Sequence, residues 1–348
     1  MKPIIKPALR RLWRDRSTLQ FGLDPRYAVL LAGVGPEVVT VLGALDGTRD
    51  TAEVVTAAHV AGIAEETTRG ILDELRRHRL IDDAEQGAMG GWRGDDRERL
   101  QPDLAALSLL HREPAAGVSV LAARRAMLVS VYGAGRVGAS IATLLAAEGV
   151  GHLSITDPAP VRYRDLAPAG LANSGIGRSR EREAATAVHR VAGTVRTDRA
   201  PGRKPDLAVL APVGPLDPEV PAALVREGVP HLFASVREIT GIVGPLVLAG
   251  RSACLRCQEL HRAERDPYWP RIATQLESFR DNNDPCESTL ATTVSAQAAT
   301  QALSYLDGTR EPATLDGTLE VDLSDWRWRR RSWDPHPRCS CGGNAVHS

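Results

Sequence analysis

The segment that most constrains the fold is residues 127–138, MLVSVYGAGRVG, where a buried-type strand runs directly into a glycine-rich turn and a helix. Gly133 permits the tight turn, Gly135 lets a phosphate approach the backbone, and Gly138 allows the helix to pack closely on the strand. Asp157 ends the next strand, about 20 residues on, where a carboxylate can accept ribose hydroxyls. These residues predict a nucleotide-binding turn; the alternative is a glycine turn kept only for packing.

Further strands follow the glycine turn and alternate with helical segments. Apolar runs at 152–157, 206–212 and 230–236 have the length of buried strands, and a long helix is expected at 288–308, before a late strand at 318–323. Strands alternating with helices predict an α/β fold with a Rossmann-like, doubly wound parallel sheet.

The N-terminal residues predict a separate small module. Residues 18–31 read as a hairpin split by Asp24 and Pro25, and three helical patterns follow at 35–47, 50–62 and 64–81. A hairpin with three helices has the size of a winged-helix module of the α+β class. A polar, glycine-rich stretch from 84 to 103 and a short apolar helix at 104–110 come next. We therefore predict a module at 1–84, a linker at 85–110 and an α/β domain at 111–348.

Four of the five cysteines form two closely spaced pairs, Cys254 with Cys257 and Cys339 with Cys341. Thiolates at these spacings can complete a tetrahedral Zn²⁺ site with no open coordination position, which is typical of a structural metal. Such a site would fasten the C-terminal segment to the α/β domain; free buried cysteines are the alternative. Cys286 precedes a helix, where a thiol has a lowered pKa, and its role is left open.

Composition excludes some partners. Lys and Arg number 43, and so do Asp and Glu, so no net charge favours nucleic acid or a membrane surface. No apolar run reaches the roughly 18 residues of a membrane helix, and the N-terminus lacks a signal-peptide core, so we expect a cytoplasmic protein. The segment WRWRRR at 326–331 is interpreted as a sheet-edge strand with a solvated face.

The sequence VYGAGRVGASIATLLAAEGVGHLSITDPAPVRYRDL, the SGIG motif at 174–177 and the two cysteine pairs together resemble the ThiF/MoeB/HesA group of ubiquitin-activating-enzyme-like adenylyltransferases. The resemblance covers roughly residues 125–348. It implies a ThiF-type fold with a structural zinc, and a reaction that adenylates the C-terminal carboxyl of a small protein or peptide with Mg-ATP.

Several charged positions of that family are altered here. Asp165 and Pro168 stand for the Asn and Arg of the family's NLxRQ motif, Arg180 replaces a Lys, and Val213 stands for the Asp that binds magnesium. Such losses remove charge stabilisation of the transition state, each by roughly 10²–10³ in rate. We therefore assign no catalytic residue and interpret the nucleotide set as vestigial: Gly133, Gly135, Gly138, Asp157 and Arg180.

The N-terminal module is similar to the small PqqD-like domains that bind the leader of a precursor peptide as an added strand. By this resemblance, the leader pairs along Tyr27, Val29 and Leu31 and packs against the third helix near Ile71 and Leu75. The combination, with LHRAERDPYWP at 260–270, resembles the ThiF-like leader-binding proteins of azoline/thiazole peptide clusters. In those clusters a separate YcaO cyclodehydratase uses the ATP.

The resulting prediction is a zinc-containing, degenerate adenylyltransferase that binds a leader peptide and docks a YcaO cyclodehydratase; a homodimer is left open. The main alternative is an active adenylyltransferase that uses the glycine turn, Asp157 and Cys286 on a peptide or sulfur-carrier carboxylate. A winged-helix DNA-binding protein is disfavoured because acidic residues offset the arginines of the third helix. A nicotinamide-dependent oxidoreductase would have no place for the cysteine pairs.

Overall fold

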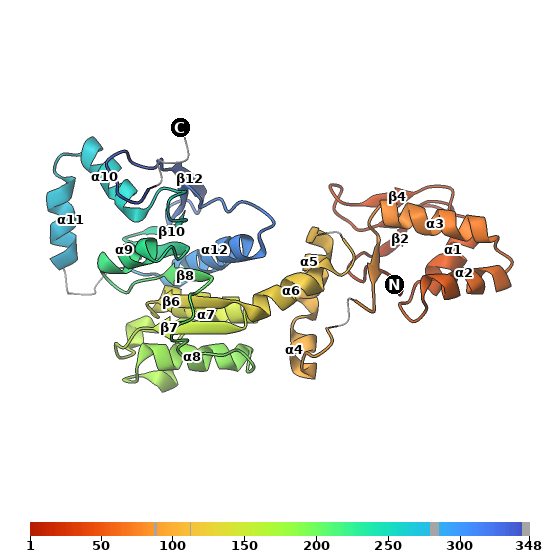
Figure 1. The fold of residues 1–348 in the computed structure, drawn as a ribbon, viewed down its shortest axis with the longest axis horizontal. Helices are drawn as coiled ribbons and strands as arrows, with labels where there is room; N and C mark the ends of the chain where they lie inside the picture. Colours follow the sequence, from red (N-terminus) through yellow and green to blue (C-terminus); the bar gives the residue numbers. More distant parts are fainter. Residues whose placement is uncertain (87–88, 112, 279–284, 343–348) are drawn as a thin grey trace. The chain divides into compact units, whose positions relative to one another are not determined.

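The computed structural model describes residues 1–86, 89–111, 113–278 and 285–342. The chain divides into two compact units, Met1–Ala123 and Arg124–Ser348 (Figure 1). Each unit has a hydrophobic core of its own.

The first unit contains the predicted hairpin and the three predicted helices. Its elements are β1 (Pro3–Ile5), β2 (Arg11–Trp13), β3 (Leu19–Phe21), β4 (Val29–Leu31), α1 (Pro36–Ala44), α2 (Thr51–Val60), α3 (Glu65–Arg77) and β5 (Ile81–Asp83). Strands β2, β3 and β4 form an antiparallel sheet in that order, so β4 is an edge strand. Asp24 makes the β3–β4 turn, since its carboxylate accepts the Arg26 N–H and its carbonyl accepts the Ala28 N–H.

The helices of this unit begin where the sequence predicts. Their apolar faces are buried, also as predicted. Asp50 caps α2 in a reciprocal box with Glu53, which satisfies two backbone N–H groups that the helix would otherwise leave unpaired. Helix α3 turns Leu72 and Leu75 inward, where both are completely buried together with Phe21.

Residues of the predicted linker are more ordered than the sequence suggests. Helices α4 (Gly94–Arg99), α5 (Gln101–His111) and α6 (Ala116–Ala126) follow the hairpin–helix module. Leu100, Leu107, Leu121 and Met89 are buried in a small cluster of their own. The apolar residues that stabilise this region are spread over three short helices, so no single window shows a helical period. The domain boundaries stay a prediction.

The second unit is built on a seven-stranded mixed sheet. Its strands are β6 (Leu128–Tyr132), β7 (His152–Thr156), β8 (Leu207–Leu210), β9 (His231–Arg237), β10 (Thr240–Val247), β11 (Gly317–Asp322) and β12 (Trp328–Ser332), in the order β12-β11-β10-β9-β8-β6-β7. Its helices are α7 (Arg136–Ala147), α8 (Arg180–Val191), α9 (Glu219–Arg226), α10 (Leu255–Arg265), α11 (Trp269–Ser278) and α12 (Ser288–Asp307).

The predicted parallel strands are confirmed, but the sheet as a whole is mixed. Strands β7, β6, β8 and β9 run parallel, whereas β9, β10, β11 and β12 pair antiparallel. Strand β10 follows β9 after a two-residue connection, which is too short for the crossover that parallel strands need. Strand β12 is at the edge of the sheet with exposed side chains, as predicted for WRWRRR.

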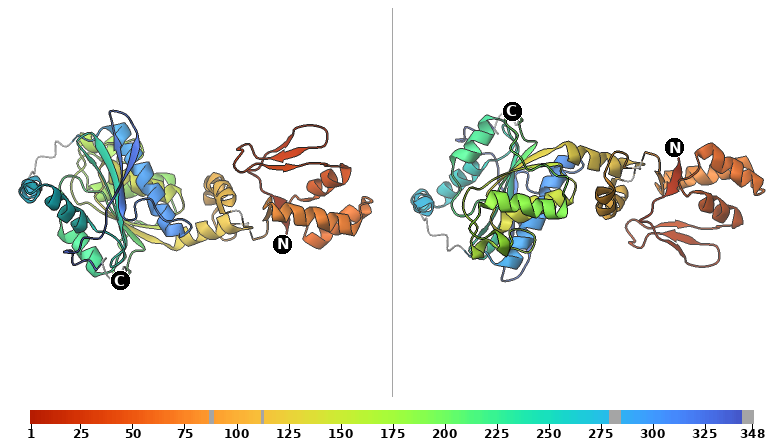
Figure 2. Two further views of the ribbon diagram at one scale, coloured as in Figure 1. Left: turned by 90° about the horizontal axis from the view of Figure 1, so that it is seen from above. Right: turned by 90° about the horizontal axis from the view of Figure 1, so that it is seen from below.

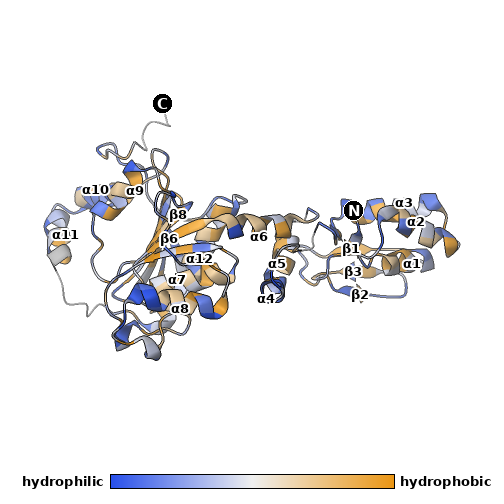
Figure 3. Ribbon diagram, turned by 60° about the horizontal axis from the view of Figure 1, so that its bottom comes forward, coloured by the Kyte–Doolittle hydropathy of each residue, from blue (hydrophilic) through white to orange (hydrophobic). Residues whose placement is uncertain are grey.

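Helices cover both faces of this sheet (Figure 2). Alternate β8 residues point to opposite faces: Leu207 and Val209 pack with α7, α8 and α12, and Ala208 and Leu210 pack with α9 and the start of α10. Figure 3 shows β6 and β8 as hydrophobic along their length, which fits strands buried on both faces. Among the helices of the described residues, none has the length and apolar character needed to span a bilayer.

Candidate functional site

The glycine turn between β6 and α7 is required by the packing of the fold. Gly133 has a φ of +91°, and a Cβ on it would lie 2.1 Å from the Ala211 carbonyl oxygen. A Cβ on Gly138 would lie 2.0 Å from the Gly133 carbonyl oxygen. Both glycines are therefore explained by the close approach of β6, α7 and the end of β8, whether or not a nucleotide binds.

Gly135 is the glycine that a phosphate would approach, and a side chain already lies against it. A Cβ on Gly135 would come within 2.5 Å of Val213 Cγ2. By the resemblance described above, Val213 is expected to stand where that family has its magnesium-binding Asp. An apolar side chain thus stands beside the turn where a metal-bound phosphate needs a carboxylate.

Asp157 and Arg180 are both engaged in buried contacts. The Asp157 carboxylate accepts the Ala134 N–H at 2.8 Å and the Ala159 N–H at 3.2 Å. Arg180 donates two hydrogen bonds to Asp165, at 2.9 and 3.1 Å, and lies 3.5 Å from Asp157. Because the Arg180 guanidinium already lies between the charges of two carboxylates, it has no positive charge available to stabilise a phosphate.

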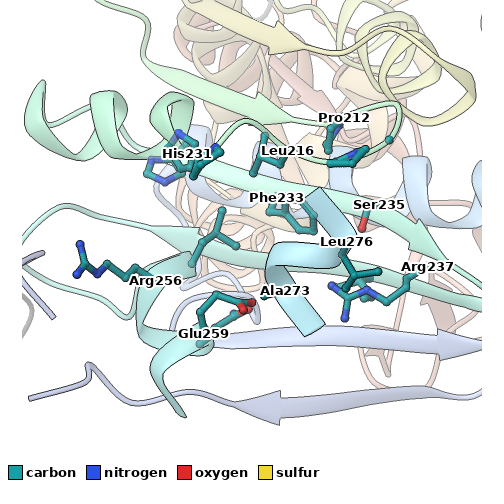
Figure 4. A pocket seen from close by; sticks show the side chains of 18 of the residues that line it. Pro212, Leu216, His231, Phe233, Ser235, Arg237, Arg256, Glu259, Ala273 and Leu276 are labelled. Atoms are coloured by element: carbon teal, nitrogen blue, oxygen red, sulfur yellow. The ribbon is translucent and has the colours of Figure 1, made fainter. Parts of the chain in front are cut away.

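Of the predicted nucleotide residues, Gly135 lines one end of a large cleft. The cleft has a volume of about 1340 Å³ and extends from Gly135 along β9 to α10, α11 and the cysteine pairs. In Figure 4, Pro212, Leu216 and Phe233 line one side, and Ala273 and Leu276 of α11 line another. Two arginines beside the glycine turn, Arg136 and Arg164, also line the cleft. The sequence does not predict a role for either arginine, because neither occupies a position that a motif assigns to ligand binding.

A buried histidine also lines this cleft. His231 is completely buried, its Nδ1 lies 3.0 Å from the Val229 carbonyl oxygen, and its Nε2 has no hydrogen-bond partner among the described residues. Burial lowers the pKa of His231 below its usual 6.5, although the hydrogen bond to Val229 opposes this shift. The side chain is therefore held in its neutral form.

The four paired cysteines converge as predicted. Cys254 Sγ lies 3.7 Å from Cys257 Sγ and 3.6 Å from Cys339 Sγ, and Cys257 Sγ lies 3.5 Å from Cys341 Sγ. Four thiolates about 2.3 Å from one zinc ion are about 3.8 Å apart, so the spacing fits a tetrahedral site. The His336 N–H donates to Cys257 Sγ at 3.3 Å, which stabilises a thiolate there.

A second cluster lies beside the cysteines and contacts the same segment. His336 Nδ1 accepts the Arg338 N–H, and His336 Nε2 faces Glu264 at 3.0 Å. The hydrogen bond from His336, followed by that from Arg338, lowers the pKa of Glu264. This cluster therefore ties the C-terminal segment to α10.

Cys286 lies two residues before α12 and lines the cleft near the glycine turn. Arg136 donates to the Cys286 carbonyl oxygen at 2.6 Å, which links α7 to the start of α12. The thiol is partly buried against the main core. Its chemical role stays open.

The predicted peptide-binding residues lie in β4, just before it, or on α3, and all but one of them have exposed surface that a peptide could contact. Tyr27 is exposed, Val29 and Leu31 are half-buried on the edge strand, and Ile71 is half-buried on α3. Leu75 is completely buried in the core. A peptide docked on this conformation would therefore not touch Leu75, because that side of α3 already packs against the sheet.

Comparison with known proteins identifies the family of the central segment. Residues 111–206 match the model of the ThiF family, and a search of curated proteins finds no match. The microcin C7 biosynthetic enzyme MccB in complex with N-formylated MccA is 16% identical, with a TM-score of 0.72 over 99% of this chain and 100% of that one. E. coli MccB with ATP is 15% identical, with a TM-score of 0.69 over 98% and 99%. PaaA is 15% identical, with a TM-score of 0.67 over 94% of this chain and 99% of that one. Residues 111–206 are therefore a ThiF-family segment, and the unit that contains most of them has a ThiF-type fold.

Proposed function

We propose that the chain is a cytoplasmic peptide-binding protein of ribosomal-peptide maturation. Its first unit binds the leader of a precursor peptide. Its ThiF-type unit, which no longer performs ATP chemistry, presents that peptide to a separate YcaO-type cyclodehydratase for azoline and thiazole formation. The observation that carries the proposal is the contact of Val213 with Gly135 at the nucleotide end of the cleft.

The charges around the glycine turn support the loss of ATP chemistry. Adenylation separates pyrophosphate from the α-phosphorus, and the developing charge requires a metal or free cations. Here the Asp that would hold the metal is Val213, and the buried guanidinium of Arg180 is held by Asp165. Pro168 supplies no charge in place of the family's arginine.

The β4 edge supports peptide binding by the first unit. An edge strand presents unpaired backbone groups, and a peptide strand added at β4 can satisfy them. MccB, whose likeness extends over nearly the whole of both chains, has been solved in complex with MccA. A short added strand with two or three buried side chains would give micromolar affinity, about −8 kcal/mol.

In this proposal the zinc is structural. Cys254 and Cys257 at the start of α10 would hold it together with Cys339 and Cys341, and a four-thiolate site offers no position for water or substrate.

An active adenylyltransferase is the second candidate, favoured by one observation. MccB has been solved with ATP and with AMPCPP, and in this chain a wide cleft opens beside the glycine turn, with Arg136 and Arg164 on its wall. In that reaction a peptide carboxylate oxygen attacks the α-phosphorus of ATP, and pyrophosphate leaves.

ATP–pyrophosphate exchange separates the two candidates. The probe is a precursor peptide with a Cys/Ser/Thr-rich core, to be sought in a short reading frame near this gene, and the full-length protein is assayed with and without a YcaO cyclodehydratase. We expect leader binding by fluorescence polarisation and no exchange by this protein alone. Peptide-dependent exchange would replace the proposal by the second candidate, and absence of leader binding would contradict leader recognition.

A further inference from the structure

Where β9 ends, the cleft contains an arginine without an ion-pair partner among the described residues. This arginine is Arg237, the last residue of β9, and its side chain is exposed. Arg262 of α10 lines the same cleft and lies 5.2 Å from the centroid of the Trp269 ring and 5.5 Å from that of Trp333. Arg331 of β12 lies 5.8 Å from the centroid of the Trp333 ring.

The carboxylates nearby pair with Arg262 and Arg331 and leave Arg237 without a partner. Glu259 accepts a hydrogen bond from Arg262 at 2.6 Å, and Glu320 lies 3.5 Å from Arg331. Burial lowers the pKa of Arg262, Glu259 raises it, and the like charges of Arg237 and Arg331 lower it further. Because Arg237 repels Arg262, an anion bound beside Arg237 would lessen this repulsion. Glu238 follows Arg237 in the chain, but neither Glu238 nor Glu259 forms an ion pair with Arg237 among the described residues.

The same part of the cleft has an apolar wall. Ile272 and Leu276 of α11 line the cleft with 39% and 48% of their surface exposed, and Phe233 lines it from β9 (Figure 4). Exposed apolar side chains in the same cleft as the unpaired Arg237 suit a ligand that brings apolar groups and a negative charge together. A nucleotide triphosphate offers the charge without the aliphatic groups.

We propose that Arg237, with Arg262 behind it, forms a recognition subsite for a carboxylate side chain of a peptide lying in this cleft. The inference rests on the proposed peptide-binding function and specifies its substrate class: a segment in which Asp or Glu alternates with apolar residues. Arg237 supplies a planar fork of donors for the carboxylate, which lysine cannot reproduce. Arg262, which lies near the Trp269 and Trp333 rings and is paired with Glu259, is the second cation of this subsite.

The test uses the full-length protein and a pair of fluorescein-labelled octapeptides. One alternates leucine with glutamate, and the other alternates leucine with glutamine. We expect the glutamate peptide to bind at least about tenfold more tightly, and Arg237→Gln to remove most of this difference while leaving the glutamine peptide unaffected. Arg237→Lys should recover only part of the difference, because the charge returns without the fork.

Arg256→Gln is the matched control, since Arg256 is another exposed arginine on the cleft wall, at the start of α10. It should change the affinity for either peptide less than about twofold. Equal binding of the two peptides, or equal losses in the Arg237 and Arg256 variants, would overturn the subsite. Binding of fluorescent ATP that depends on Arg237, without binding of the glutamate peptide, would assign the anion to a phosphate and also overturn it.

Failure of this subsite and failure of the proposed function give different results. Leader binding by the β4 edge depends on Leu30 and not on Arg237. If the protein binds its leader but does not distinguish the glutamate peptide from the glutamine peptide, the proposed function stands and only the carboxylate subsite is rejected.

Discussion

Val213 lies against Gly135 so closely that its Cγ2 would be 2.5 Å from a Cβ added to that glycine. The contact joins the segment after β8 to the first turn of α7. It gives Gly135 a packing role that is independent of any phosphate, and it puts a hydrocarbon where the resembled family has a carboxylate.

Gly135→Ala should therefore destabilise the chain through a clash that depends on Val213. We expect a loss of about 1–3 kcal/mol in the free energy of unfolding, because a β-branched side chain has few rotamers with which to move away. The same substitution in a Val213→Ala background should cost much less. Urea unfolding of the four proteins measures the difference; an equal cost in both backgrounds would contradict the contact.

Arg180→Met should lower stability by about 3–5 kcal/mol, because it leaves Asp165 buried without its partner. Both side chains are almost fully buried in the pair. Arg196→Met is the control, since Arg196 and Asp198 form an exposed, solvent-screened pair whose loss should change stability much less. Similar losses in the two variants would mean that the buried pair has no special structural role.

The purified chain should contain about one zinc per molecule, held by the two cysteine pairs. Elemental analysis should show that Cys339→Ser loses the metal and that Cys286→Ser retains it, since Cys286 lies outside the cluster. Chelation should also expose the segment after β12 to proteases. Undiminished zinc in the Cys339 variant would exclude that residue as a required ligand.

His231 should make the fold sensitive to mild acid. Its pKa is lowered from 6.5 in the folded chain, so just below pH 6.5 the unfolded chain binds a proton that the folded chain does not. Stability must then fall as the pH decreases through that range, by up to about 1.4 kcal/mol per pH unit. Denaturant unfolding of His231→Phe should show a shallower dependence than the wild-type chain. Parallel curves would indicate that His231 titrates normally.

Leu30→Pro should weaken leader binding, because Val29 pairs with Phe21 of β3 and the backbone donor that β4 presents at its free edge is the N–H of Leu30. We expect a loss of about tenfold or more, measured by fluorescence polarisation with a labelled leader. Val60→Asp is the control, because Val60 is an exposed apolar residue at the end of α2. Equal losses of affinity in the two variants would indicate that the leader does not bind along the β4 edge.

The glycine turn, the four parallel strands and the cysteine cluster could all be predicted because each rests on local chemistry. A buried strand followed by Gly133 has few alternatives, and pairs such as Cys254 and Cys257 indicate one site. Strand β10 was missed because it contains glycine and proline at Gly244 and Pro245 and lacks the alternation of a typical strand.

Other features depend on contacts between distant residues. The sequence marks Arg180 as a phosphate ligand by its position, but Asp165 decides its role through a buried ion pair. Leu75 shows the apolar spacing of a groove residue, yet it lies in the core, because spacing alone does not distinguish a buried face from a binding face. The cleft arginines belong to separate elements, so no local pattern brings Arg237 and Arg262 together.

The cysteine cluster has a consequence for how the chain is made. Cys254 and Cys257 emerge from the ribosome long before Cys339 and Cys341, and α11, α12, β11 and β12 lie between the two pairs. The metal site can close only after all of these elements have been synthesised. A chain released before Cys339 would keep two unpaired thiols and an unfastened sheet edge, so zinc occupancy would report that translation had run to the end of the domain.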